Sequence, residues 1–200
     1  MISDDFKKWH FILASGSPRR RKLLADMGFS FKVMEKQISE SCPDGLKREE
    51  IAVFLAKRKA EEFLNEVKDD EIVITADTIV WCNNRVLGKP SDRDEAISIL
   101  RELSGRVHEV ITAVCLLSSR TSQTFFSETK VSFTILSEEE ILSYVDNYYP
   151  YDKAGAYGIQ EWIGMVGIDH IEGSFFNVMG LPVQKLYSNL KKFIHDHNNN

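Results

Sequence analysis

The sequence predicts an α/β fold in which helices flank a mixed central sheet. Short apolar, β-branched runs alternate with stretches of helical periodicity, which is typical of strands that alternate with helices. Two long extended segments, residues 107–117 and 124–136, follow one another and add an antiparallel pair. The chain has 200 residues, of which 43% are hydrophobic and 28% charged, and this suits one domain or one two-lobed domain. We expect the pocket at the carboxyl ends of strands.

The first part of the chain has clear local signals for its elements. Ser17 can cap a helix that begins at Pro18, because the missing proline N–H is not needed at that position. Gly28 is a natural helix stop. The expected elements are an N-terminal extension over 1–10, a strand at 11–14, a helix at 18–27, a strand at 29–34, a loop over 36–47 and a long helix over 47–67.

The rest of the chain continues the alternation. Asp77 and Thr78 separate two apolar runs, and Ser137 followed by Glu140 has the spacing of a capping box. The expected elements are strands at 71–76 and 79–82, a helix at 91–103, the two extended segments, a helix at 137–148, a glycine-containing loop over 150–160, a strand at 165–171, a helix at 182–194 and a frayed polar tail over 195–200.

Composition and charge exclude several classes of protein. A net charge of −5 argues against general nucleic-acid binding, which rests on a broad basic surface. No run approaches 18 apolar residues, and the acidic start is unlike a signal peptide, so we expect no membrane association. Cys42, Cys82 and Cys115 are far apart and read as free thiols in a reducing compartment. The expected location is the cytoplasm, and the expected partner is a small anionic ligand.

The most unusual local feature is the basic run Arg19–Lys22 at a predicted helix start. Four cations there oppose the helix macrodipole unless an anion is bound. With free N–H groups and the hydroxyls of Ser15 and Ser17, the run predicts a phosphate cradle. The alternative is a solvated basic helix surface, and we expect Arg21 and Lys22 to be solvated in either case.

Two charged residues lie where apolar ones are expected. Asp77 stands between two apolar runs, and a carboxylate there is rarely buried unless it is paired or holds a metal. At a strand end it could bind Mg²⁺ or activate water, whereas the alternative is a tight turn between hairpin strands. Lys59 lies on the stripe of Leu55 and Phe63, so it either extends to solvent or points at a buried anion.

Weaker signals complete the candidate set. Pro90 keeps Lys89 extended and Gly88 allows a ligand to approach, while Glu40 lies in a loop. The loop over 153–160 matches neither a P-loop nor a dinucleotide motif, but its Gln160 carries the donor and acceptors that suit a base edge. A phosphate cradle, an acid and two or three lysines together predict a nucleotide-phosphate hydrolase.

Six motifs in order resemble the Maf family of nucleoside triphosphate pyrophosphatases, over about residues 11–190. The motifs are LASGSPRR (13–20), ADTIV (76–80), LGKP (87–90), LSGRVH (103–108), DKAGAYGIQ (152–160) and NVMGLP (177–182). The resemblance implies a single Maf-like domain over 1–200, with an α/β fold like that of Maf and ITPase proteins and two lobes around a cleft, often as a homodimer. It also implies hydrolysis of a nucleoside triphosphate to the monophosphate and pyrophosphate with Mg²⁺ or Mn²⁺.

The resemblance also implies roles for individual residues. Asp77 would be the proton acceptor and, with Glu40, a metal ligand. Lys59 and Lys89 would join them in catalysis by holding phosphates. The implied substrate-binding residues are Ser15, Ser17, Arg19, Arg20, Thr78 and Gln160.

The substrate implied by the resemblance is dTTP and UTP, because Arg19, Thr78 and Gln160 are typical of the branch that prefers these nucleotides. Removal of non-standard nucleotides and cell-division arrest are further roles that it implies. Three alternatives stay open: a pyrophosphatase that prefers 7-methyl-GTP, a nucleotide-binding regulatory module of cell division with little turnover, and DNA binding through the basic run, which the net charge disfavours.

Overall fold

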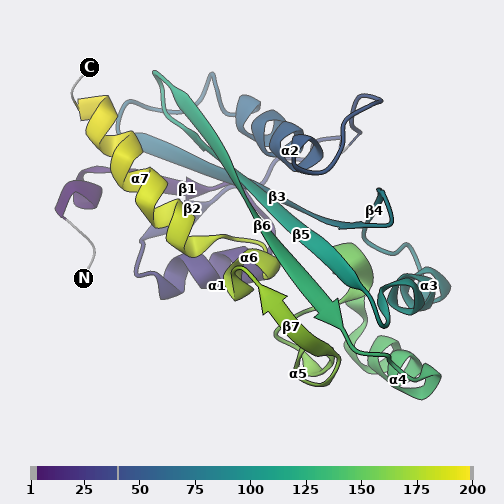
Figure 1. Cartoon of the computed structure of the whole chain (residues 1–200). Helices are drawn as coiled ribbons and strands as arrows, with labels where there is room; N and C mark the ends of the chain where they lie inside the picture. Colours follow the sequence, from purple (N-terminus) through teal and green to yellow (C-terminus); the bar gives the residue numbers. More distant parts are fainter. Residues whose placement is uncertain (1–3, 40, 199–200) are drawn as a thin grey trace. The chain divides into compact units, whose positions relative to one another are not determined.

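A computed structural model describes residues 4–39 and 41–198 (Figure 1). The described chain divides into two compact units, which matches the expected two lobes. Unit 1 contains the residues up to Asp77, those from Thr112 to Ser127 and those from Gly180 onward, and unit 2 contains Thr78–Ile111 and Glu128–Met179. The single domain expected over 1–200 stays a prediction.

The predicted mixed sheet is confirmed. Its strand order is β2-β1-β3-β5-β6-β7, and β4 pairs with β3. β1 is parallel to β2 and to β3, whereas β4 and β7 are antiparallel to their neighbours β3 and β6. β3, β5 and β6 each contribute residues to both units. The strands are β1 (His10–Leu13), β2 (Phe31–Val33), β3 (Glu71–Cys82), β4 (Arg85–Leu87), β5 (Val107–Leu117), β6 (Ser122–Phe133) and β7 (Ile168–Glu172).

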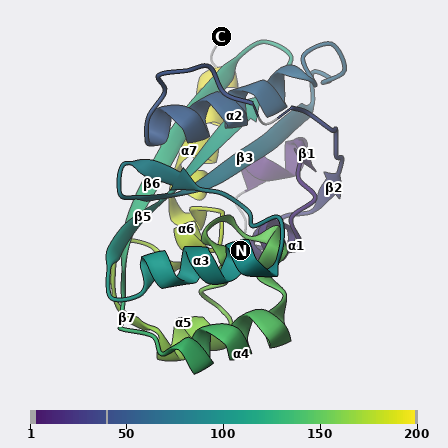
Figure 2. The same ribbon diagram turned by 90° about the vertical axis from the view of Figure 1, so that its right-hand side faces the viewer.

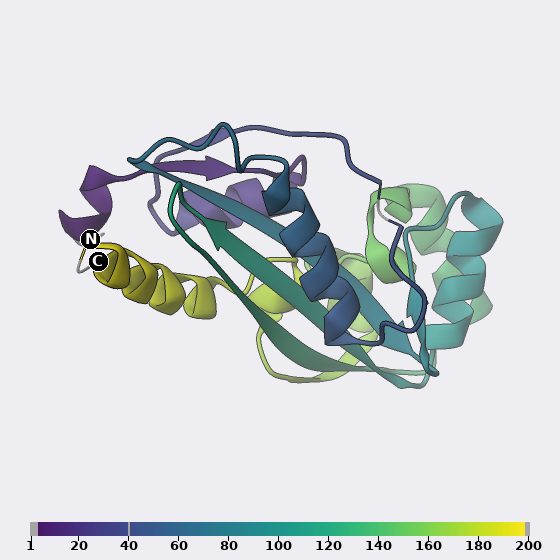
Figure 3. The same ribbon diagram turned by 90° about the horizontal axis from the view of Figure 1, so that it is seen from above.

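Within the described residues, unit 1 contains β1, β2, parts of β3, β5 and β6, and four helices. α2 lies over the strands (Figure 3), and Thr75 Oγ1 of β3 donates a 2.7 Å hydrogen bond to the carbonyl of Ala56 in α2. Phe6 packs against Phe11, Phe29 and Tyr187, with ring centroids 5.3–6.2 Å apart, so the chain before β1 belongs to the core. The helices of unit 1 are η1 (Asp4–Lys8), α1 (Pro18–Asp26), α2 (Glu49–Glu61) and α7 (Val183–Asn198).

Unit 2 surrounds an apolar core with short helices. α3 and α4 lie side by side (Figure 2), and buried side chains of both join those of β5 and of the loop before α5 in one cluster. Ala156, Tyr157 and Ile159 belong to this cluster, so the glycine-containing loop is part of the core. The helices of unit 2 are α3 (Arg93–Leu103), α4 (Glu138–Tyr148), η2 (Pro150–Asp152), η3 (Ala154–Ala156), α5 (Trp162–Val166) and α6 (Phe175–Val178).

Several predicted boundaries are wrong. The helix predicted over 47–67 is shorter, because i→i+3 turns such as Phe63 N–H to the Ala60 carbonyl (3.0 Å) replace it beyond Glu61. The last helix is longer and includes residues 195–198, since the His197 ring packs edge-on against Trp9 with centroids 4.8 Å apart. The helix contradicts the frayed tail predicted over 195–200 as far as residue 198, and residues 199–200 lie outside the described residues.

The largest correction concerns Asp77. The two apolar runs form the single strand β3, so Asp77 lies neither at a strand end nor in a tight turn. β1 pairs with β3 as far as Ile74, and β4 pairs from Val80 onward. Because β1 pairs with β3 before Asp77 and β4 pairs with it after Asp77, the strand is continuous at this residue.

Two expectations from composition also have structural counterparts. The three cysteines are free thiols, as predicted, and Cys82 and Cys115 are buried. Throughout residues 4–39 and 41–198, no helix is long and apolar enough to cross a membrane.

Candidate active site

The loop between β1 and α1 forms the predicted helix start. Ser17 is the N-cap of α1, and its Oγ accepts the N–H of Arg20 at 3.4 Å. The Ser17 N–H in turn donates to Ser15 Oγ at 3.2 Å, and Ser15 is 8% exposed. Both hydroxyls therefore lie at the positive end of the helix, where an anion would be stabilised.

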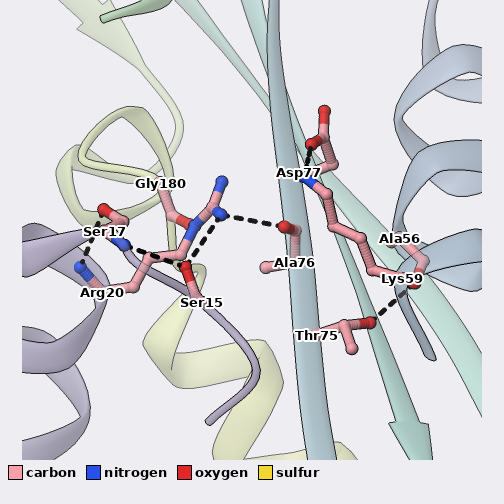
Figure 4. A network of polar contacts seen from close by, with 9 residues as sticks. All are labelled: Ser15, Ser17, Arg20, Ala56, Lys59, Thr75, Ala76, Asp77 and Gly180. Atoms are coloured by element: carbon pink, nitrogen blue, oxygen red, sulfur yellow. Dashed lines mark hydrogen bonds and ion pairs between the residues drawn. The ribbon is translucent and has the colours of Figure 1, made fainter. Parts of the chain in front are cut away.

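Arg20 ties this loop to two distant segments (Figure 4). Its Nη1 donates to the Ala76 carbonyl at 2.8 Å and to Ser15 Oγ at 3.4 Å, and its Nε donates to the Gly180 carbonyl at 2.8 Å. The Ala14 N–H donates a hydrogen bond to the Ile74 carbonyl at 2.9 Å. Arg20 donates to the Ala76 carbonyl, two residues further along β3. Arg20 therefore anchors the backbone next to Asp77 beyond the point where β1 ends.

Lys59 from α2 forms an ion pair with Asp77 Oδ1. The two side chains are only 18% and 10% exposed, and each compensates the burial of the other. Of the two alternatives for Lys59, the ammonium that points at a buried anion is the one observed, and this anion is the carboxylate of Asp77. In Figure 4 the pair lies on one side of β3, and Arg20 with the two serines lies on the other.

The side chains that could act as metal ligands determine which kind of metal site is possible. Across the described residues no three His, Cys, Asp or Glu side chains lie close enough to hold a metal, and Glu40 lies outside the described residues. Mg²⁺ is often bound by one or two carboxylates together with substrate phosphates and water. The Asp77 carboxylate would fit a cation that is also coordinated by phosphate oxygens of a ligand and by water, rather than a cation enclosed by protein ligands alone.

The other implied residues are placed as follows. Arg19 is half-buried in the first turn of α1, whereas Arg21 and Lys22 are exposed, as predicted. Thr78, Lys89 and Gln160 belong to unit 2, where the last two are exposed.

Two of the sequence motifs pack together in unit 2. The Gly155 N–H donates to the Gly88 carbonyl at 3.0 Å, so the segment that carries Lys89 contacts the loop that leads to Gln160. Gly155 has φ +73°, and a Cβ there would lie 2.9 Å from Val80 Cγ2. Only glycine therefore allows this approach of the loop to β3.

Sequence reasoning missed the buried polar groups that hold this loop. Tyr144 donates its hydroxyl to Glu161 Oε2 and accepts the Gly158 N–H at 3.0 Å. Lys153 Nζ lies 3.1 Å from Glu161 Oε1. Burial, and then the contact with Glu161, raise the pKa of Tyr144. The only sequence signal was a lysine within a run of small and apolar residues.

His108 is buried at 2% exposure. Its Nε2 lies 2.8 Å from the Tyr157 hydroxyl, and its ring packs edge-on against Phe133. Burial lowers the pKa of His108 to about 4, so the ring is neutral at pH 7.

The fold and the site define an α/β protein with a serine- and arginine-containing loop at a helix N-terminus and, across β3, a buried lysine–carboxylate pair. The chain belongs to the Maf family, because the family model described as Maf-like protein matches residues 10–193. A relative from Parabacteroides distasonis, named dTTP/UTP pyrophosphatase, is 51% identical over 95% of this chain and 99% of its own. A relative of the same name from Flavobacterium johnsoniae is 46% identical over 97% of this chain and all of its own.

Similarity to solved structures is weaker. The Ham1 protein of Staphylococcus aureus is 12% identical over 92% of this chain and 98% of its own, with a TM-score of 0.48. A nucleoside-triphosphatase described as a dITP/XTP pyrophosphatase, from Mycobacterium abscessus, is 14% identical over 64% of this chain and 75% of its own, with a TM-score of 0.41. Membership of the family therefore rests on the sequence matches.

Proposed function

We propose that the protein is a nucleoside triphosphate pyrophosphatase that hydrolyses dTTP and UTP to the monophosphate and pyrophosphate. The observation that carries the proposal is the buried Lys59–Asp77 pair next to the backbone that Arg20 ties to the serine loop. Relatives that are 46–51% identical over at least nine tenths of the chain are named dTTP/UTP pyrophosphatase, and this supports both reaction and substrates.

Asp77 is the proton acceptor in this proposal. Lys59 engages Oδ1, so we assign Oδ2 to the attacking water. The water oxygen forms a bond to the α-phosphorus, its proton passes to Asp77, and the bond from the α-phosphorus to the bridging oxygen breaks. Pyrophosphate leaves with that bond's electron pair.

The phosphates bind at the start of α1 and at the lysines. Ser15, Ser17 and the helix N–H groups provide hydrogen bonds, and Arg19 and Lys89 provide positive charge. The main role of Arg20 is positioning, because its guanidinium donates hydrogen bonds to two backbone carbonyls. A divalent cation held by Asp77 and Glu40 would neutralise phosphate charge when bound.

Arg19, Thr78 and Gln160 select the nucleotide in this proposal. The terminal amide of Gln160 offers one donor group and one acceptor, which complement the O4 acceptor and the N3–H donor of uracil and thymine. Free thiols, two of them buried, support a reducing compartment such as the cytoplasm. A homodimer stays a prediction.

A triphosphate panel tests the proposal. The purified protein is incubated with Mg²⁺ or Mn²⁺ and each of dTTP, UTP, CTP, dATP, GTP and 7-methyl-GTP, and pyrophosphate is measured. We expect the highest kcat/KM for dTTP and UTP. Faster hydrolysis of 7-methyl-GTP would contradict the proposed substrate, and tight nucleotide binding without pyrophosphate release would favour the regulatory alternative.

A further inference from the structure

A largely buried polar network in unit 2 holds the segment that carries Gln160. We call Tyr144, Lys153 and Glu161 the Glu161 network. Lys153 Nζ lies 3.1 Å from Glu161 Oε1, and the Tyr144 hydroxyl donates to Glu161 Oε2, so both carboxylate oxygens are engaged. The same hydroxyl accepts the Gly158 N–H at 3.0 Å. The network therefore fixes the chain at two points, one on each side of Gln160.

Stability alone does not explain this arrangement. Tyr144 is fully buried, Lys153 is 8% exposed and the Glu161 side chain is 20% exposed, and Lys153 Nζ also lies 2.8 Å from Asp152 Oδ1. Taking a lysine and a carboxylate out of water is costly, and apolar side chains of similar size are often as stabilising. A largely buried ion pair that is retained despite this cost suits a role in holding one specific conformation.

The turn itself brings the Gln160 side chain back over Gly158. The Glu161 N–H donates to the Gly158 carbonyl at 2.9 Å, which closes a tight turn. A Cβ on Gly158 would lie 2.9 Å from Gln160 Nε2 and 2.7 Å from Glu161 Cδ. The glycine therefore leaves the space that the Gln160 amide and the Glu161 carboxylate occupy.

We propose that Tyr144, Lys153 and Glu161 are positioning residues that hold the Gln160 amide in one orientation and thereby make the enzyme discriminate uracil and thymine from cytosine. The inference rests on the proposed function, in which Gln160 reads the base. Uracil offers an acceptor at O4 and a donor at N3, whereas cytosine offers a donor at N4 and an acceptor at N3. A half-turn of the terminal amide exchanges its donor and acceptor and would match cytosine equally well. Discrimination therefore requires a held orientation, not only the presence of a glutamine.

Tyr144→Phe tests this inference, because it removes one hydroxyl and keeps the buried ring. We expect KM for UTP to rise about tenfold, the effect of about one hydrogen bond, with kcat changed less than about twofold. The preference for UTP over CTP in kcat/KM falls by a similar factor, because the Gln160 amide is free to turn. The Gly158 amide hydrogen exchanges faster in this variant.

Tyr148→Phe is the matched control. Tyr148 is on the same helix and stacks on Tyr144 with ring centroids 5.0 Å apart, but it is not part of the network. We expect its KM, its UTP preference and its Gly158 exchange to equal those of the wild type. Glu161→Gln is the second variant, should Tyr144→Phe not fold, and we expect the same loss of preference.

Two outcomes would overturn the inference and can be told apart. If wild-type protein prefers UTP but the Tyr144→Phe and Glu161→Gln variants keep that preference, or lose kcat equally for UTP and CTP, the network has only a structural role. If wild-type protein shows no preference for dTTP and UTP, the proposed function fails and the inference fails with it.

Discussion

The two units hold their charged groups in different ways. In unit 1 the Lys59–Asp77 pair and the Arg20 guanidinium lie around β3, and their charged atoms act on the backbone or on each other near the candidate chemistry. In unit 2 His108, Tyr144 and Lys153 are buried and Glu161 is partly buried, while Gln160 is exposed. The difference teaches that the charged groups of unit 1 pair with each other and with the backbone around β3, whereas the buried polar groups of unit 2 hold the conformation of a loop.

The largest expected effect is that of Asp77→Asn in unit 1. Loss of a general base lowers kcat by about 10³-fold, and the isosteric amide keeps an oxygen that can accept from Lys59, so the chain still folds with a lower free energy of unfolding. The measurement is pyrophosphate release from dTTP, with circular dichroism as a check of folding. Asp26→Asn is the matched control, since Asp26 pairs with Lys22 on an exposed helix face and should not alter turnover. An Asp77→Asn protein with wild-type activity would contradict the role of Asp77 as the proton acceptor.

The next largest effect is a pH dependence in unit 2. The pKa of His108 is about 4 when folded and about 6.5 when unfolded, so the unfolded chain binds the proton first as the pH falls. The free energy of unfolding has its full value above pH ~6.5, and it decreases by about 3 kcal/mol as the pH falls to about 4. Urea unfolding at several pH values, followed by the fluorescence of Trp81 and Trp162 in unit 2, measures this loss.

Two variants measure how much of this pH dependence of the unfolding free energy comes from His108. His108→Gln should unfold with a smaller pH dependence than wild type, because the titrating ring is gone. His170→Gln should keep the wild-type dependence, since His170 is exposed. Equal pH profiles for the two variants would show that the buried ring does not control the stability of unit 2.

Arg20→Ala separates positioning from phosphate binding in unit 1. We expect a loss of about 2 kcal/mol in the free energy of unfolding, because the carbonyls of Ala76 and Gly180 lose a charged donor. Arg21→Ala, the next residue on the helix, is exposed and should leave stability unchanged. Unchanged stability of Arg20→Ala together with a raised KM would mean that Arg20 serves only the phosphates.

The smallest effect is expected at the surface of unit 2. Arg93 and Asp146 link α3 and α4 through an ion pair at 2.6 Å, and both side chains are nearly half exposed. Exposed pairs contribute little, so Asp146→Asn should leave Tm and activity unchanged. A clear fall in Tm would show that exposed charge, and not only the buried network, stabilises unit 2.

Sequence patterns predicted the elements whose causes are local. The start of α1 follows from Ser17 and Pro18, and the capping box at Ser137 and Glu140 is present as predicted. The boundaries that failed depend on packing. α7 continues because His197 meets Trp9, and β3 passes through Asp77 because β1 and β4 pair with its two ends.

The sequence by itself determined the α/β class, the helix start at Ser17, the free thiols and, through six motifs, the resemblance to the Maf family. Only the tertiary structure decided what the charged side chains contact. Arg20 donates to carbonyls 56 and 160 residues away, and Tyr144 meets a carboxylate 17 residues further along. Helix caps and turns depend on neighbours within a few residues, and residue types therefore predict them. Long-range partners depend on how the whole chain packs, and residue types alone do not specify them.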